Sequence, residues 1–267
     1  MTREQTARKR RRLWIILGTV LAAILLVCAG FAVYVGDYYH ADAAAVQAMA
    51  ISDDITVGKI GRDNLVFAPP NPKAGLIFYP GGKVEYTAYA PLMRACAEKG
   101  ILCVLVKMPC NLAVLDMNAA DGIAGQYPDI DAWYIGGHSL GGAMAAAYAA
   151  DHSGELDGLI LLAAYSAKDL KDSGLDVLSV YGSEDRVLNR EKYEGYQGNL
   201  PSGTTEVVIE GGCHAGFGSY GPQKGDGTPL IEVQQWLGHS TLETTADLYA
   251  HLEYETKINS AETLKKI

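Results

Sequence analysis

Short apolar runs, separated by segments rich in glycine and polar residues, recur along the chain from about residue 55 onward. Runs of this length, apolar throughout, are typical of strands buried on both faces, which occur mainly in parallel sheets. We expect such strands at 76–79, 101–106, 132–135, 159–164, 177–181 and 205–209.

Two further elements of the pattern complete the predicted fold. Helices are predicted over about 86–99 and over the alanine-rich run 143–150, whose helix propensity is very high. Two early strands, 55–57 and 65–67, are expected to form an antiparallel edge. The pattern therefore predicts an α/β fold, with a mostly parallel central sheet and helices on both faces. A short segment, 111–127, leaves room for at most one or two helices beside the sheet.

The N-terminal apolar run differs from the others in its length. It extends without a charge over 13–35, and a helix of that length spans roughly 35 Å, enough to cross a bilayer core of about 30 Å. The apolar region of a cleaved signal peptide is shorter, about 7–15 residues. A small-residue sequence at Ala41–Ala43 leaves cleavage open as the alternative. We predict a single-pass signal anchor that lies in the cell membrane.

The charge distribution predicts which end of the anchor lies in the cytoplasm. Residues 1–12 carry a net charge of +5 and the whole chain −9, so everything after residue 12 carries −14. Basic residues before a span hold the N-terminus in the cytoplasm, which places the part of the chain after the span outside the cell. An acidic domain repels nucleic acid, so no functional nucleic-acid partner is expected.

These observations divide the chain into five parts. They are a basic N-terminus (1–12), a transmembrane anchor (13–35), a short helical or loose linker (36–54), one globular domain (55–229) and a helical tail (230–267). The four cysteines outside the anchor form no C-x-x-C pair, and Cys96, Cys103 and Cys110 are expected on a helix, a strand and a loop. No metal or organic cofactor is implied.

The strongest chemical signal is a G-x-S-x-G sequence at Gly137–Gly141, between the strand 132–135 and the helix 143–150. A sharp turn from a strand into a helix presents the serine hydroxyl at the end of the strand, and glycines allow the backbone to crowd there. Ser139 is therefore the candidate nucleophile.

A serine nucleophile needs a base, and the base needs an acid to orient it. In hydrolases built on such a turn, the order along the chain is serine, acid, histidine. Asp185 follows the strand 177–181, and His214 lies in a glycine-rich loop after the strand 205–209. Glu184 is the rival acid, but the Gly-x-x-Asp spacing favours Asp185. The predicted triad is Ser139, His214 and Asp185.

Catalysis by such a triad also requires N–H donors for the oxyanion of the tetrahedral intermediate. One is expected to be the backbone N–H of Leu140, directly after the nucleophile. The other is expected from the loop after the strand 76–79, where either Gly82 or Lys83 would donate through its backbone.

Residues 55–229 resemble an α/β-hydrolase, in particular the dienelactone-hydrolase-like branch that occurs as membrane-anchored bacterial proteins. The matching segments are Tyr79–Gly82, Gly137–Gly142, Gly182–Asp185 and Gly211–His214. Many relatives carry histidine where Pro80 stands. The resemblance implies hydrolysis of carboxylic esters or related acyl bonds, through an acyl-serine intermediate, in a small-molecule substrate.

The tail resembles a different family. Residues 231–265 are similar to the C-terminal end of a phage-type tyrosine recombinase, in which a Leu-Gly-His is followed ten residues later by the tyrosine that attacks DNA. His239 and Tyr249 match these two positions. Phosphoryl transfer by tyrosine needs a cluster of cations, and the His-x-x-Arg of recombinases occurs nowhere in this chain. We therefore expect His239 and Tyr249 to be vestigial.

The sequence thus predicts a membrane-anchored serine hydrolase of unspecified substrate and oligomeric state. The alternative is an inactive envelope protein, whose hydrolase domain is compromised because a recombinase fragment has replaced its natural C-terminal end. DNA recombination or integration by the chain is not expected.

Overall fold

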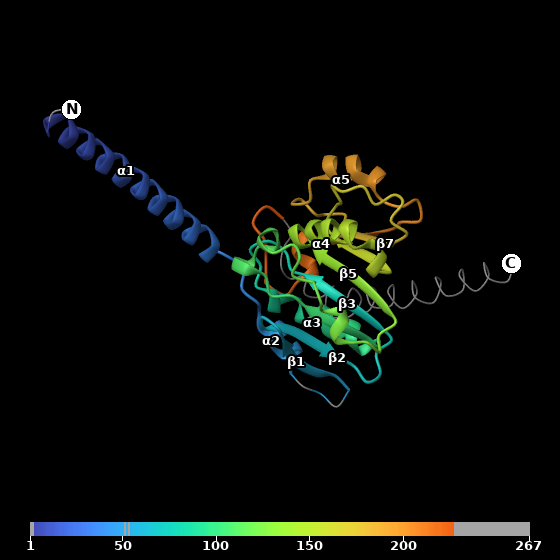
Figure 1. Ribbon diagram of the computed structural model, residues 1–267. Helices are drawn as coiled ribbons and strands as arrows, with labels where there is room; N and C mark the ends of the chain where they lie inside the picture. The colour runs from blue at the N-terminus through green and yellow to red at the C-terminus, as the bar shows by residue number, and fades with distance from the viewer. Residues whose placement is uncertain (1–2, 51, 53, 227–267) are drawn as a thin grey trace. The chain divides into compact units, whose positions relative to one another are not determined.

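The computed structural model describes residues 3–50, 52 and 54–226 (Figure 1). The chain divides into two compact units, one up to Tyr38 and one from Tyr39 onward. The tail predicted at 230–267, with His239 and Tyr249, lies outside the described residues.

The first unit is dominated by a single helix, α1 (Arg3–Gly36). Its segment 11–36 is long enough and apolar enough to cross a membrane, and among the described residues its apolar stretch is not buried. An exposed apolar surface of this length is one that a lipid bilayer would accept.

The second unit is built on an eight-stranded sheet in the order β1-β2-β4-β3-β5-β6-β7-β8. Each predicted strand is present, with bounds that shift by up to a few residues. The strands are β1 (Thr56–Ile60), β2 (Asn64–Ala68), β3 (Ala74–Tyr79), β4 (Ile101–Leu105), β5 (Ala132–His138), β6 (Gly158–Leu162), β7 (Asp176–Gly182) and β8 (Thr205–Ile209).

The direction of the strands agrees with the apolar pattern. β3 to β8 run parallel to one another, whereas β2 pairs antiparallel with both β1 and β4, so that β1 and β2 form the predicted antiparallel edge. The carboxyl ends of the parallel strands therefore meet at one edge, and the loops that follow β3, β5, β7 and β8 gather there.

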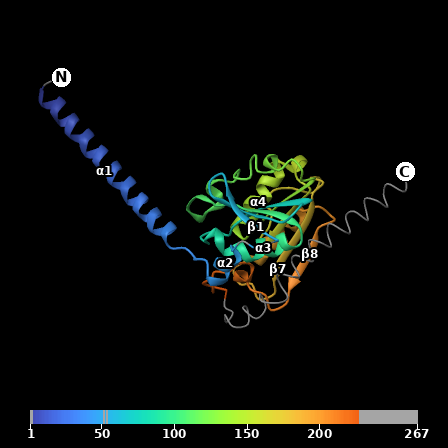
Figure 2. The ribbon, with the colours of Figure 1, turned by 90° about the horizontal axis from the view of Figure 1, so that it is seen from below.

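Two hydrophobic layers cover the two faces of the sheet, and Figure 2 shows helices on both of these faces. Because side chains alternate along a strand, Phe78 packs into one layer and Tyr79 into the other. The first layer includes α2 (Ala43–Ala48) and α3 (Ala90–Glu98), and the second includes α4 (Leu140–Asp151). Another helix, α5 (Arg190–Tyr196), follows β7 and precedes β8 along the chain.

Short 3-10 turns occur at the start of the predicted helix 86–99 and in the segment 111–127. The predicted helix over 86–99 begins with a 3-10 turn, Tyr86–Tyr89, before α3. Residues 111–127 contain 3-10 turns of three residues, Ala113–Leu115 and Ala124–Gln126, after a similar turn at Pro109–Asn111. Pro109, Gly122 and Gly125 in this stretch favour such turns over longer helices.

α4 begins three residues before the alanine run that predicted it, and two glycines occupy its first turn. A Cβ on Gly141 would lie 2.3 Å from both the Tyr79 and Pro80 carbonyl oxygens, so the end of β3 rests directly on the backbone of α4. This contact places the loop after β3 beside the loop after β5.

Replacing Gly141 by alanine tests this contact. Helix propensity alone favours alanine by about 1 kcal/mol, but overpacking against rigid backbone costs roughly 1–3 kcal/mol. We expect Gly141→Ala to lower the free energy of unfolding, measured by urea titration. Gly154→Ala is the control, because no atom lies within 4 Å of its added Cβ. Equal stability of the two variants would contradict the contact.

Candidate active site

Ser139 occupies a strained turn between β5 and α4. Its φ of 53° and ψ of −121° lie in a region that residues with side chains rarely adopt. The Ser139 N–H donates to the Leu162 carbonyl of β6 at 2.9 Å, which fixes the turn to the sheet. The side chain of Ser139 is partly exposed, so the strained backbone presents an accessible hydroxyl.

The neighbouring glycines are required by close packing. A Cβ on Gly137 would lie 2.6 Å from the Gly141 carbonyl carbon, and one on Gly142 would lie 2.5 Å from the Ala164 Cβ. Real Cβ atoms do not approach this closely, so only glycine permits the strand and helix to meet at this angle. Close packing thus explains why the sequence motif has glycine at these positions.

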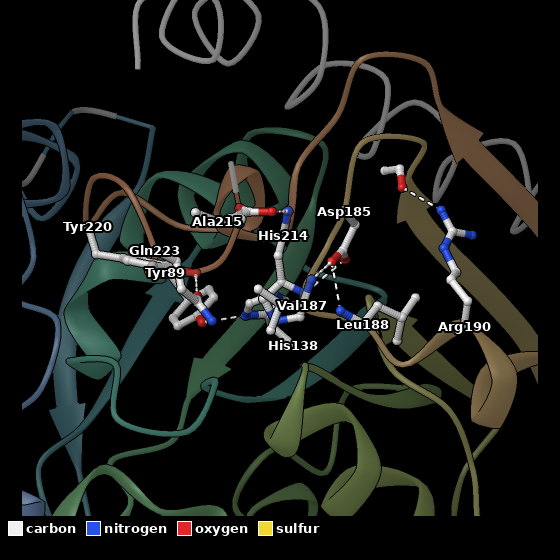
Figure 3. Close-up of polar contacts among 12 residues, drawn as sticks. Tyr89, His138, Asp185, Val187, Leu188, Arg190, His214, Ala215, Tyr220 and Gln223 are labelled. Atoms are coloured by element: carbon white, nitrogen blue, oxygen red, sulfur yellow. Dashed lines mark hydrogen bonds and ion pairs between the residues drawn. The ribbon is translucent and has the colours of Figure 1, made fainter. Parts of the chain in front are cut away.

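Asp185 and His214 form a buried hydrogen-bonded pair (Figure 3). The His214 Nδ1 and the Asp185 Oδ2 are 2.8 Å apart, and the two side chains are 2% and 0% exposed. The other carboxylate oxygen, Oδ1, accepts the N–H groups of Val187 at 2.9 Å and Leu188 at 2.8 Å. Both oxygens of this carboxylate are therefore satisfied by donors.

Burial raises the pKa of Asp185, but hydrogen bonds and charge from His214, together with the two backbone N–H groups, outweigh it and lower the pKa overall. The rival acid is placed differently. Glu184 is exposed and lies near Arg186, with 3.8 Å between the charged groups. The structure therefore pairs His214 with Asp185, as the sequence spacing favoured.

A second buried carboxylate holds the His214 loop. Asp226 accepts the His214 N–H at 2.9 Å and the Ala215 N–H at 2.7 Å, one with each oxygen. The loop also packs tightly on the turn after β7, since a Cβ on Gly182 would lie 2.1 Å from the Gly212 carbonyl oxygen. The sequence analysis did not single out Asp226, because no local pattern links it to residues eleven or twelve positions earlier.

His138 lies against His214, with ring centroids 4.5 Å apart (Figure 3). Burial lowers the pKa of His138 well below its ordinary value, the neighbouring His214 lowers it further, and a backbone contact with His214 opposes the shift. The Nδ1 of His138 is 2.8 Å from the hydroxyl of buried Tyr89. A neutral ring beside His214 places no second positive charge next to the candidate base.

The Nε2 of His214 faces the opposite way from Asp185 on its ring and is buried. It makes no hydrogen bond with any residue in the described part of the chain. This nitrogen is the one that a base would use, because the other is held by the carboxylate.

The loop after β3 carries three consecutive N–H groups, of which the first and the third donate to other residues. The Gly81 N–H donates to the Tyr89 hydroxyl at 3.0 Å, and the Lys83 N–H donates to the Asn111 carbonyl at 2.8 Å. Within residues 3–226, neither Gly82 nor Leu140 donates its N–H to another residue. These two lie side by side, since a Cβ on Gly82 would be 2.9 Å from the Leu140 side chain.

The structure thus brings most of the predicted site residues to one edge of the sheet. Asp185 and His214 are in direct contact, Ser139 lies on the turn next to His138, and Gly82 adjoins Leu140. His239 and Tyr249 lie outside the described residues. Tyr89 and Asp226, which contact site residues, carried no signal in a single sequence.

A parallel sheet in this order, with a strained serine turn and a buried carboxylate–histidine pair at its carboxyl edge, defines the class of α/β hydrolases. Residues 75–237 match the family model described as "Alpha/beta hydrolase family". Because this match covers more than half of the chain, the chain belongs to that family. No curated protein matches the sequence.

Solved structures with the same fold include enzymes. Carboxyl esterase 2 from the mycorrhizal fungus Tuber melanosporum is 11% identical, with 80% of this chain and 89% of that chain covered and a TM-score of 0.53. Est1E from Butyrivibrio proteoclasticus, with ferulic acid bound, is 14% identical over 76% and 96%, with a TM-score of 0.52. TT1662 from Thermus thermophilus is 16% identical over 68% and 98%, with a TM-score of 0.51. At these identities the likeness establishes the fold alone.

The Asp185–His214 pair predicts a pH dependence of stability. In the unfolded chain Asp185 titrates near its ordinary pKa of 3.8, and folding lowers that pKa. The pair therefore stabilises the fold above the unfolded pKa, and this contribution is lost as the pH falls through the folded pKa. We expect Asp185→Asn to be less stable than wild type at neutral pH, with the difference shrinking below the ordinary pKa of the carboxyl group.

Urea unfolding of detergent-solubilised protein, repeated between neutral pH and about pH 3, measures this difference. Asp172→Asn, at an exposed carboxylate, is the matched control. A stability difference that stays constant across the whole pH series would contradict the account of the pair.

Proposed function

We propose that the protein is a serine hydrolase that cleaves carboxylic esters or related acyl bonds through an acyl-serine intermediate. The observation that supports this most directly is the buried pair of Asp185 and His214, next to the strained turn that carries Ser139. A buried histidine held by a carboxylate has one tautomer and one orientation, as a general base requires.

In this mechanism His214 Nε2 takes the proton of the Ser139 hydroxyl while the Ser139 oxygen attacks the acyl carbonyl carbon. Asp185 accepts the Nδ1–H and stabilises the imidazolium that forms. The carbonyl π electrons move to the oxygen, which becomes an oxyanion. When the tetrahedral intermediate collapses, His214 gives its proton to the leaving alcohol, and Ser139 keeps the acyl group.

Hydrolysis of the acyl-serine repeats these steps with water as the nucleophile. His214 removes a proton from water, the hydroxide oxygen bonds to the acyl carbon, and Ser139 leaves with the proton from His214. The second half-reaction therefore releases the carboxylic acid and restores the free enzyme.

For the oxyanion, we assign Gly82 and Leu140 as the backbone donors. The sequence left Gly82 and Lys83 as alternatives, but the Lys83 N–H already donates to the Asn111 carbonyl at 2.8 Å. A donor that points at the oxyanion and is otherwise unpaired lowers the barrier most, because no bond is given up during reaction.

We further propose that α1 anchors the protein in the cell membrane and that the catalytic domain lies outside the cell. The apolar helix supports the anchor, and the basic residues that precede the apolar stretch support this orientation. The motifs that resemble dienelactone hydrolases are the ground for placing the chain near that branch. A small-molecule ester is the substrate class we favour.

The alternative, an inactive protein disabled by its tail, predicts that deletion of residues 230–267 restores activity. The contacts that hold His214 come from Asp185, Asp226 and the turn after β7, all of which precede the tail. This arrangement supports assembly of the site in the full-length chain, so we expect the deletion to bring no gain in turnover.

Substitution of Ser139 tests the proposed nucleophile. We expect Ser139→Ala to lose fluorophosphonate labelling and to lower kcat for a p-nitrophenyl ester by roughly 10⁴-fold or more, because triad members act as a unit. Ser153→Ala, which replaces a partly exposed serine in a turn after α4, is the matched control and should keep both activities. Equal labelling of wild type and Ser139→Ala would reject the mechanism.

The proposed orientation has a native probe in Cys110. Cys96, Cys103 and Cys213 are buried, Cys28 lies within the apolar helix, and Cys110 is exposed on the globular unit. A membrane-impermeant maleimide added to intact, wall-stripped cells should therefore label the wild-type protein but not Cys110→Ser. Labelling that requires lysis would place the domain in the cytoplasm instead.

A further inference from the structure

The segment directly after the apolar helix is part of the globular unit. We define the strap as residues Tyr39–Asp42, which precede α2 and contact two of the loops at the candidate active site. We propose that Tyr39 is a positioning residue that holds two loops in place for catalysis. One is the loop after β3, which carries Gly82 and is called the oxyanion loop below, and the other is the His214 loop. This inference rests on the proposed function.

The first contact is with the loop that follows β3. The Tyr39 N–H donates to the Lys83 carbonyl at 2.8 Å, and the Glu85 N–H donates to the Tyr39 carbonyl at 2.8 Å. This pair of bonds makes a parallel β-bridge between Tyr39 and Val84. The Glu85 carboxylate also accepts the Ala41 N–H at 3.1 Å. The strap therefore bonds to the loop after β3 at the residues that directly follow Gly82.

Lys83 explains why the loop needs such a contact. Its φ is 59°, a left-handed conformation that costs a residue with a side chain free energy and persists only where the surroundings fix it. The Lys83 N–H is held by Asn111, and the Lys83 carbonyl is held by Tyr39. Loss of the bond from Tyr39 removes one of the contacts that fix the backbone of Lys83, and a shift there would displace the adjacent Gly82 N–H.

The second contact is with the loop that follows His214. The Tyr39 hydroxyl accepts the Lys224 N–H at 3.0 Å, and its ring lies 5.5 Å from the ring of Tyr220. The Asp42 N–H donates to the Ser219 carbonyl at 2.9 Å. Tyr39 thus bonds to the oxyanion loop through its backbone and to the His214 loop through its side chain.

Cleavage after Ala43, the alternative to an intact anchor, would remove the whole strap. The cut domain would keep Ser139, Asp185 and His214 but lose the bonds at Lys83, Glu85 and Lys224. The structure therefore assigns the uncut chain as the fully active form, and gives the juxtamembrane segment a role in catalysis beyond tethering.

The test uses two full-length variants, each with an inserted site for a sequence-specific protease. One insertion lies between Gly36 and Asp37, so that cutting releases the domain with its strap. The other lies after Ala50, so that cutting separates the strap from the domain. Activity is measured on membranes before cutting and on the released domain afterwards.

We expect the first cut to leave kcat unchanged. The second should lower kcat by about 10- to 100-fold with a smaller change in KM, since a displaced oxyanion donor affects the transition state. A synthetic peptide of residues 37–50 should restore kcat. Hydrogen exchange of residues 81–88, which needs no turnover, should speed up only after the second cut. Equal kcat and equal exchange after both cuts would overturn the proposal.

Point variants keep the test valid if the strapless domain fails to fold. Asp42→Pro removes the N–H that bonds to Ser219 and also the side chain that caps α2, whereas Asp42→Ala removes the cap alone. A lower kcat in Asp42→Pro than in Asp42→Ala supports the strap, and identical kcat and exchange would contradict it. If the uncut chain lacks turnover but the second cut still speeds up exchange of residues 81–88, the result counts against the proposed function and not against the strap.

Discussion

A carboxylate that is removed from water must be satisfied by nearby donors, and the arrangement of this site follows from that constraint at Asp185. Its side chain is fully buried, and three donors meet it: two N–H groups of its own turn and the ring of His214. Because the donors on the turn are local, only the histidine has to come from elsewhere. The loop after β8 must therefore lie against the turn after β7, and Gly182 and Gly212 permit that approach.

Close packing at glycines also connects the other parts of the site. Gly141 allows the end of β3 to rest on α4, and Gly82 lies against the Leu140 side chain. The Tyr89 hydroxyl accepts the Gly81 N–H and contacts His138, whose ring lies against that of His214. Tyr89, which takes no part in the proposed chemistry, therefore links the loop after β3 to the ring beside His214. Movement of one of the loops at the site would therefore displace residues in the others.

The sheet could be predicted because its strands are buried on both faces, so their apolar runs are continuous and stand out in the sequence. The candidate triad was identifiable for a similar reason: each member lies within a few residues of the end of a strand, and the Gly-x-x-Asp spacing favoured Asp185 over Glu184. The start of α4 could not be placed, since Gly141 and Gly142 have low helix propensity and are needed for contact instead.

Contacts between distant residues were beyond prediction. Tyr89 and His138 are separated by 49 positions, and Tyr39 and Lys224 by 185, so no local periodicity links either pair. The strap lies within residues 36–54, which were expected to form a short helical or loose linker, because a composition rich in alanine and acidic residues says nothing of partners so far along the chain. The recombinase-like tail, with His239 and Tyr249, remains a prediction from sequence.

The central claim is that Ser139, His214 and Asp185 act together, with Gly82 and Leu140 as the donors to the oxyanion. A crystal structure of the protein after reaction with a phosphonate ester tests it most directly. We predict that the phosphorus is bonded to the Ser139 oxygen, with its non-ester oxygen within hydrogen-bond distance of the Gly82 and Leu140 N–H groups and His214 Nε2 close to the Ser139 oxygen. A phosphonyl group on another residue, or an oxygen bound by other donors, would contradict the account.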